Sequence, residues 1–229
     1  TIVVSFPSTE LAMQSVGEIT SSVIPLTLEA IDKTTLDAIT GFIDVKYPKI
    51  AECVFLIELM DKDIEKLDLL KQICKNFDAI DFTYTSDPKE REELWLARKG
   101  AYPSMARISP NVLVEDGTVP LDKLPQAVKE IKKITQEYNL KLALIFHAGD
   151  GNLHPMITFD ERNKKQTETV KDCGLKILKK IVELGGTISG EHGIGIDKKQ
   201  AMKLQFDYST LNIFWKIKKA FDPKNLCNP

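Results

Sequence analysis

Two of the chain's three histidines stand close together in the segment FHAGDGNLHP, residues 146–155. If the chain turns at Asp150 and Gly151 as a two-residue hairpin loop, His147 faces His154 across two antiparallel strands. Directly opposed residues share a face of a sheet with Cβ atoms about 5 Å apart, so both imidazoles could reach one metal ion. A single histidine is more simply explained as a core or surface residue, but a facing pair favours metal binding at least equally.

The third histidine lies in a second glycine-rich segment, GTISGEHGIG, residues 186–195. Gly190 and Gly193 enclose Glu191 and His192, and such glycines let the backbone turn sharply and leave room for a ligand near the main chain. A glycine-rich loop with an exposed polar pair remains an alternative interpretation. The segment is not a dinucleotide-binding fingerprint, because its GxGxxG pattern is incomplete.

Together the two segments offer a three-ligand metal site made of His147, His154 and Glu191. Two imidazoles and one carboxylate leave coordination positions open, which is typical of catalytic metal sites rather than closed structural ones. His192 is left over and is suited to act as a general base. Imidazole titrates near neutrality, and a metal makes a bound hydroxyl group more acidic.

The composition limits the class of protein that can carry such a site. The chain has 229 residues, 43% hydrophobic and 28% charged, which suits one large soluble domain or two small ones that share a sheet. A formal net charge of -2 provides no basic field for nucleic acid, so we expect no nucleic-acid partner. The cysteines form no CxxC pair that would indicate a zinc or iron-sulfur site; they are Cys53, Cys74, Cys173 and Cys227.

The sequence also bears on location and completeness. No apolar run approaches the roughly 20 residues that cross a bilayer, and the N-terminus has no signal-peptide pattern, so we expect a cytoplasmic protein. The chain starts at Thr1 with a strand-like apolar run rather than with a methionine. We therefore expect it to be a segment of a longer protein.

The elements that must position the histidines alternate along the chain, because apolar β-like runs are separated by charged segments of helical period. We expect strands at residues 1–6, 26–31, 53–59, 80–85, 111–116, 140–148 and 153–159. We expect helices at residues 8–23, 33–44, 62–77, 89–108, 121–138, 163–184, 198–205 and 209–220. The short connection between the last two strands makes them antiparallel neighbours. The predicted class is α+β, with a mainly antiparallel β-sheet covered by helices on one face.

At this point the motifs resemble a known family, the FAD-linked 2-hydroxyacid oxidoreductases, in their C-terminal substrate or cap domain. The resemblance covers residues 1–229, and its motifs occur in the expected order: LWLAR (94–98), EDGTVP (115–120), HAGDGNLHP (147–155), GEHGIG (190–195) and FDPKNLCNP (221–229). The first histidine motif is most similar to that of glycolate oxidase flavoprotein subunits and D-lactate dehydrogenases. The resemblance implies an FAD-linked oxidase C-terminal fold with ferredoxin-like elements.

The family resemblance assigns roles to individual residues. His147, His154 and Glu191 match the ligands of a divalent metal, often zinc, and His192 matches the proposed base. Arg98 matches an arginine that clamps the substrate carboxylate, for which a guanidinium offers paired donors, and His147 is expected beside the substrate as well. Without the motif, Arg98 would be interpreted as a solvated helical charge.

The chain departs from the hydroxyglutarate-type members of the family at two positions. Val114 stands where those enzymes have a substrate-binding lysine, and Met156 stands where they have an asparagine. Both differences count against a second carboxylate on the substrate. Asn152 matches the asparagine of the motif and is expected to hold the turn or to support the ligands rather than to do chemistry.

The resemblance implies an enzyme that oxidises a small 2-hydroxy acid of the glycolate or D-lactate type to the 2-oxo acid. The family's N-terminal FAD-binding domain is not contained in this chain, so we expect the chain to be inactive alone, with FAD held by a domain from the same gene or a partner chain. No FAD-binding residue is assigned. An electron-transfer partner, through which the protein lies at a membrane, and a homo-oligomer are further expectations.

Two alternatives to the flavoenzyme stay open from the residues alone. The first is a metal-dependent hydrolase that uses the same two histidines and carboxylate and needs only metal and water. The second is a domain that binds metal but has no catalytic activity. Hydrolysis by the isolated chain would favour the first alternative.

Overall fold

The structure is a computed structural model that describes residues 1–43 and 47–229 of the chain. It contains an eight-stranded sheet with the strand order β4-β1-β3-β2-β7-β8-β5, and the short β6 also pairs with β8. All of these strand pairs are antiparallel, which confirms the predicted α+β class. The strands are β1 (Ile2–Phe6), β2 (Thr27–Asp32), β3 (Cys53–Glu58), β4 (Asp81–Tyr84), β5 (Asn111–Val114), β6 (Gly117–Thr118), β7 (Leu142–His147) and β8 (Asn152–Phe159).

The helices follow the predicted order along the chain. They are α1 (Thr9–Ser22), α2 (Lys33–Thr40), α3 (Leu67–Asn76), α4 (Pro88–Lys99), α5 (Ala101–Ile108), α6 (Leu124–Glu137), α7 (Lys164–Glu183), α8 (Met202–Gln205) and α9 (Tyr208–Phe221), with 3-10 turns η1 (Asp61–Lys66) and η2 (Leu121–Lys123). The side chain of Ser8 accepts a hydrogen bond from the amide of Leu11 and caps α1, where the sequence predicted a helix start.

The first half of the chain forms a ferredoxin-like unit, as expected. Strands β1 to β4 lie in the order β4-β1-β3-β2, and α1 and α3 connect β1 to β2 and β3 to β4. The β7–β8 hairpin then extends the same sheet, because β7 pairs with β2. Both histidines of that hairpin thus lie on interior strands of one continuous sheet.

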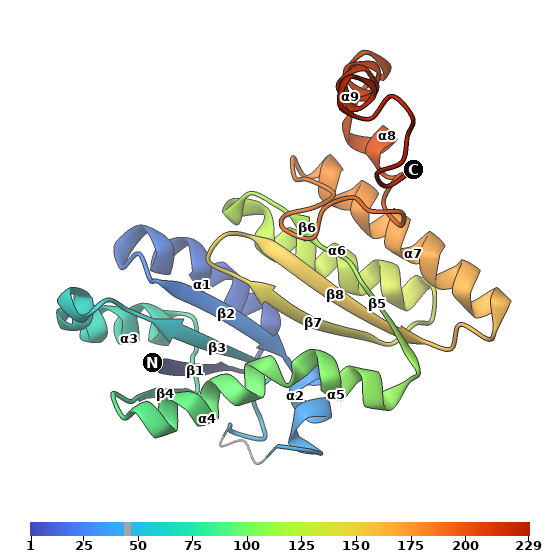
Figure 1. Cartoon of the computed structure of the whole chain (residues 1–229). Helices are drawn as coiled ribbons and strands as arrows, with labels where there is room; N and C mark the ends of the chain where they lie inside the picture. Colours follow the sequence, from blue (N-terminus) through green and yellow to red (C-terminus); the bar gives the residue numbers. More distant parts are fainter. Residues whose placement is uncertain (44–46) are drawn as a thin grey trace.

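Helices cover both faces of the sheet, so the expectation of helices on one face is wrong. Phe55 and Ile57 of β3 pack with buried residues of α1, α3, α6 and α7, whereas Val54 and Leu56 pack with buried residues of α2, α4 and α5. Figure 1 shows these two helical layers on opposite sides of the strands. Strands buried on both faces lack a polar side, which weakens the alternation that a one-sided sheet would show.

The predicted helix at residues 89–108 is two helices, α4 and α5, that meet at Gly100. Pro103 has no amide hydrogen and cannot donate to the carbonyl of Lys99 one turn earlier, which interrupts a continuous helix here. A Cβ at Gly100 would overlap the Cδ1 atom of Ile43, so a larger residue here would require the Ile43 side chain to move.

Smaller differences concern element ends. The predicted helix at 62–77 begins as the 3-10 turn η1, and the one predicted at 198–205 is helical only at α8. The helix predicted at 33–44 ends at Thr40, and position 44 lies outside the described residues. The sequence did not predict β6, since two residues are too few to show an alternating pattern.

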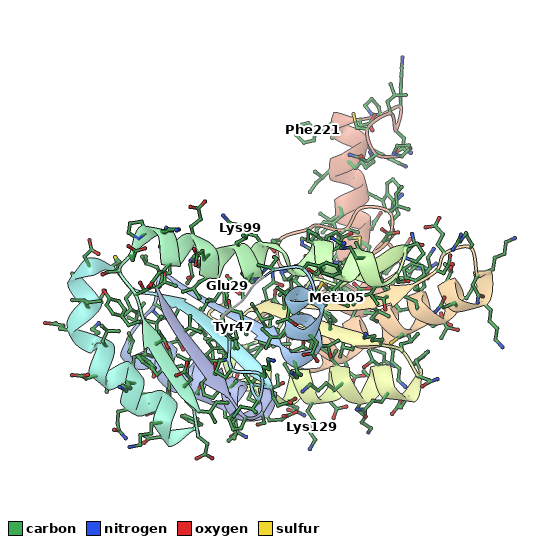
Figure 2. All side chains as sticks on the ribbon, turned by 90° about the horizontal axis from the view of Figure 1, so that it is seen from below. Glu29, Tyr47, Lys99, Met105, Lys129 and Phe221 are labelled. Carbon is green, nitrogen blue, oxygen red and sulfur yellow. The ribbon has the colours of Figure 1, made fainter. Side chains whose placement is uncertain are left out.

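The C-terminal helix α9 projects away from the sheet (Figure 1), and Figure 2 places Phe221 far out on it. None of its residues is buried. Throughout the described ranges, no helix combines the length and the apolar character that crossing a membrane requires.

Candidate functional site

The histidine hairpin has a wider loop than predicted. Residues 148–151 form the loop, so His147 pairs with Asn152 while His154 pairs with Ile145. The predicted direct opposition of the two histidines is therefore wrong. Because the register is displaced by two residues, both side chains still share a face, and their ring centroids are 5.2 Å apart.

Local hydrogen bonds explain the wider loop. The amide of Gly149 donates to the carbonyl of Leu28 on β2, at 3.1 Å, which attaches the loop to the neighbouring strand. The Asp150 side chain accepts a bond from the amide of Asn152, at 3.0 Å, and Gly151 adopts a φ of 81°. These bonds hold the loop at residues 148–151, and Asn152 begins β8.

The segment 189–192 is held in place by one buried carboxylate, that of Asp116. Its Oδ2 atom accepts bonds from the Ser189 hydroxyl at 2.7 Å and from the amides of Gly190, Glu191 and His192 at 3.1, 3.1 and 2.7 Å. Burial raises the pKa of Asp116, but these bonds outweigh it and lower the pKa to about 2. An ionised Asp116 therefore fixes the backbone that carries Glu191 and His192.

The structure brings the three histidines and Glu191 together. Glu191 Oε1 lies 3.1 Å from His154 Nε2, 3.4 Å from His147 Nε2 and 3.7 Å from His192 Nε2. The rings of His154 and His192 are stacked with centroids 5.0 Å apart. Two motifs more than thirty residues apart thus present three imidazoles to one carboxylate.

Ligand atoms of Asp116, His154, Glu191 and His192 all lie within 4.8 Å of one another, a spacing that could hold a metal ion. This group differs from the predicted ligand set, because it contains Asp116 and His192 and does not contain His147. Asp116 is a poor candidate ligand, since its Oδ2 already accepts four hydrogen bonds. His147 stays a candidate because its Nε2 reaches the same oxygen of Glu191.

His147 has a partner that the sequence did not reveal. Its Nδ1 atom lies 2.7 Å from Oε1 of Glu29, whose side chain is only 9% exposed. The bond to Glu29 raises the pKa of His147 against the opposing effect of burial. Glu29 is a charged residue between the apolar Leu28 and Ala30 of β2. A charge at such a position was the signal in the sequence that could have indicated its role.

Arg98 lies beside this pair and binds Glu29. Its Nε and Nη2 atoms lie 3.0 and 2.8 Å from Glu29 Oε2, and the Arg98 side chain is 14% exposed. Burial raises the pKa of Glu29, but the bond from His147 and the charge of Arg98 outweigh it, so the pKa is lowered. Arg98 is therefore a largely buried, paired charge next to His147, and not a solvated one.

His154 is in a different environment. It is buried, and its Nδ1 atom lies 3.4 Å from the backbone carbonyl of Glu115. Burial lowers the pKa of His154, and the charges of His147 and His192 lower it further. His154 is thus favoured in its neutral form, which is the form that binds metals.

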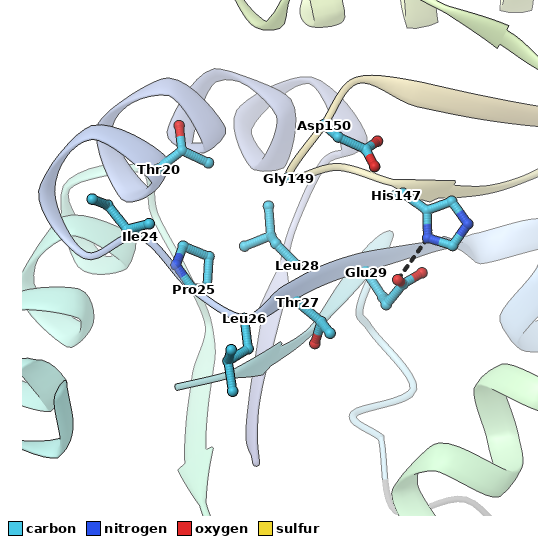
Figure 3. Close-up of a pocket in the computed structure, with 10 residues that line it drawn as sticks. All are labelled: Thr20, Ile24, Pro25, Leu26, Thr27, Leu28, Glu29, His147, Gly149 and Asp150. Carbon is cyan, nitrogen blue, oxygen red and sulfur yellow. Dashed lines mark hydrogen bonds and ion pairs between the residues drawn. The ribbon is translucent and has the colours of Figure 1, made fainter. Parts of the chain in front are cut away.

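A cavity of about 380 Å³ opens next to the bond between His147 and Glu29 (Figure 3). Ile24 and Leu26 line its apolar part and are largely exposed. Its polar part includes two acids, Glu29 and Asp150. A ligand carboxylate is therefore disfavoured in this cavity and would find its complementary charge on the Arg98 side.

Comparison with known proteins gives the same family over the whole chain. The family described as "FAD linked oxidases, C-terminal domain" matches residues 1–229. Glycolate oxidase subunit GlcD of Escherichia coli (strain K12) is 40% identical over 232 residues, which are 100% of this chain and 46% of that protein. GlcD of Bacillus subtilis (strain 168) is 36% identical over 236 residues, 100% of this chain and 50% of that protein. The chain thus spans about half the length of these curated relatives.

More distant proteins share the domain and the fold. The probable mitochondrial D-lactate dehydrogenase of Danio rerio is 26% identical over 231 residues, 99% of this chain and 46% of that protein. A crystal structure of p-cresol methylhydroxylase with substrate bound superimposes with a TM-score of 0.71 at 14% identity, covering 100% of this chain and 51% of the other; it shows the fold alone. By sequence and fold, the chain belongs to the FAD linked oxidases and forms their C-terminal domain.

Proposed function

We propose that this chain is the substrate- and metal-binding half of an FAD-dependent enzyme that oxidises a small 2-hydroxy acid, such as glycolate or D-lactate, to the 2-oxo acid. The observation that carries the proposal is the cluster in which Glu191 lies within 3.7 Å of all three histidines, next to the buried Arg98. The similarity to glycolate oxidase subunits and D-lactate dehydrogenases supports it.

The donor set fits a divalent metal, and zinc accepts two imidazoles and a carboxylate. His147, His154 and Glu191 would hold it, with the neutral state of buried His154 favouring coordination. When bound, the metal supplies positive charge that acidifies the substrate hydroxyl group. No residue of this chain is assigned to FAD, which the remaining half of the protein would hold and which supplies the acceptor for the hydride.

The chain's own residues bind the substrate and move its proton. Arg98 would bind the substrate carboxylate through the edge of its guanidinium that Glu29 does not occupy. His192, whose ring is about half exposed beside Glu191, would accept the hydroxyl proton at a ring nitrogen. Loss of that proton and of the C2 hydride together converts the 2-hydroxy acid to the 2-oxo acid.

The residues near the site also bear on the charge of the substrate. Val114 of β5 pairs directly with Met156 of β8, and both lie in the apolar cluster on that face of the sheet. An apolar pair provides no charge for a second carboxylate. We therefore expect glycolate or D-lactate to be preferred to a dicarboxylic 2-hydroxy acid.

The test uses the complete protein with its flavin-binding half, reduced anaerobically by candidate acids. We expect glycolate or D-lactate to bleach the flavin absorbance, and 2-hydroxyglutarate to do so far more slowly. If no 2-hydroxy acid bleaches the flavin, the proposal fails. Metal-dependent hydrolysis of esters without flavin reduction would support the hydrolase alternative, and metal binding without either activity would support the catalytically silent one.

A further inference from the structure

Glu29 and His147 are joined by the register of the sheet. The two residues are directly paired across β2 and β7, so their Cβ atoms share one face at close range. Their bond of 2.7 Å, drawn in Figure 3, therefore follows from strand pairing and does not depend on a mobile loop. His147 thus faces an acid on β2, while Asn152 occupies the opposed position on β8 that the sequence had suggested for His154.

The chemistry of this bond determines which ring nitrogen carries hydrogen. An ionised carboxylate only accepts hydrogen bonds, so Nδ1 of His147 must donate to Glu29. In the neutral ring, Nε2 then holds the lone pair, and Nε2 is the atom that lies 3.4 Å from Glu191. The contact of Glu29 Oε2 with Arg98 at 2.8 Å holds the carboxylate in this orientation.

We propose that Glu29 is a positioning residue that holds His147 as the Nδ1–H tautomer with Nε2 directed at the cluster, and that Arg98 holds the Glu29 carboxylate in the orientation this bond requires. The inference rests on the proposed function in so far as Nε2 serves as a metal ligand. Carboxylates that accept a hydrogen bond from a ligand histidine fix its orientation, and their loss typically lowers metal affinity about 10- to 100-fold.

The chain offers a matched control on the next strand. Glu58 of β3 pairs with Arg91 of the same helix α4, at 2.6 and 2.9 Å, and also accepts bonds from Trp95 and Thr1. None of these partners is a histidine. Glu58→Gln thus removes a similar acid–arginine pair from the same helix without touching His147.

The first experiment measures zinc affinity of the complete protein by competition with a chromophoric chelator. We expect Glu29→Gln to weaken zinc binding about 10-fold and Glu29→Ala about 100-fold, with Glu58→Gln within about twofold of the unmodified protein. Gln is expected to lose less because its carbonyl oxygen can still accept from Nδ1. Equal affinities of the Glu29 and Glu58 variants would overturn the proposal.

The second experiment needs no variant and no metal. Long-range proton–nitrogen NMR spectra of the unmodified protein, recorded at a pH high enough to leave His147 neutral, distinguish the two neutral tautomers, and we expect His147 to be protonated at Nδ1. A neutral ring of His147 protonated at Nε2 would overturn the proposal even if every variant failed to fold. If the protein bound no zinc, the metal part of the proposed function would fail, and this spectrum would still decide the role of Glu29.

Discussion

Helix α4 is tied to the sheet by two arginine–glutamate pairs seven residues apart, and only one of them belongs to the candidate site. Arg91 binds Glu58 with a side chain that is 56% exposed, whereas Arg98 binds Glu29 with one that is 14% exposed. Glu58 is paired across strands with Thr27, but Glu29 is paired with His147. The cross-strand neighbour therefore decides whether the same kind of pair serves stability alone or also positions a histidine.

The greatest effect is expected on metal binding, which should depend on His147 and His154 and not on the pair of Arg91 and Glu58. His154→Ala and His147→Ala each remove one of two proposed nitrogen ligands, so elemental analysis of the purified complete protein should show a divalent ion that both variants lose. Glu58→Gln should retain it. Unchanged metal content in the histidine variants would show that His147 and His154 do not bind the metal.

The next effect compares the stability that the two pairs provide. Arg98→Met leaves the buried carboxylate of Glu29 without its guanidinium, which is expected to lower the free energy of unfolding by about 3 kcal/mol. Arg91→Met should lower it much less, because Arg91 is largely in water. Urea denaturation of the two variants measures the difference. Equal losses of unfolding free energy in the two variants would show that the charge of Glu29 is not more strongly buried than that of Glu58.

A smaller effect is expected for Asp116, which holds the segment that carries Glu191 and His192. Asp116→Asn keeps an acceptor oxygen but removes the charge that binds three amides and that lies 3.6 Å from the buried ammonium of Lys198. We expect a loss of about 2 kcal/mol in unfolding free energy, together with weaker metal binding. Urea denaturation and the chelator competition give the two values. A variant with unchanged stability and unchanged metal affinity would show that Asp116 does not fix the segment 189–192.

The smallest effect concerns the pair of Arg91 and Glu58 and its loss at low pH. Hydrogen bonds from Arg91 lower the pKa of Glu58 to about 2 in the folded protein, from an ordinary value near 4.5. The pair's contribution to stability is therefore complete above about pH 4.5 and is lost as the pH falls through about 2. Denaturation curves of Glu58→Gln and the unmodified protein should differ slightly at neutral pH and converge near pH 2. A difference that persists below pH 2 would assign the stability to another group.

The sequence predicted those parts of the fold that depend on local pattern. The strand expected at 53–59 is β3, and the cap at Ser8 begins α1, because alternation and capping are written within a few residues. The break at Gly100 was foreseeable from Pro103. The hairpin loop begins two residues earlier than predicted, because the bond from Gly149 to Leu28 of another strand helps to set its width.

The residues that support the site could not be predicted in the same way. Glu29 reaches His147 across 118 positions, and Asp116 reaches His192 across 76 positions. Neither contact leaves a local pattern, since each depends on which strands pair and in which register. The glycine-rich motifs, in contrast, carry Glu191 and all three histidines within short, distinctive segments, which is why sequence alone could group them.

In the proposed reaction, His192 takes the substrate's hydroxyl proton within the histidine cluster. The most direct measurement is the anaerobic rate of flavin reduction by the preferred 2-hydroxy acid in the complete protein, with and without His192→Gln. We predict that the variant still binds the 2-oxo acid but reduces its flavin about 100- to 10,000-fold more slowly. A variant that binds the 2-oxo acid and reduces its flavin at the unmodified rate would show that His192 is not the base.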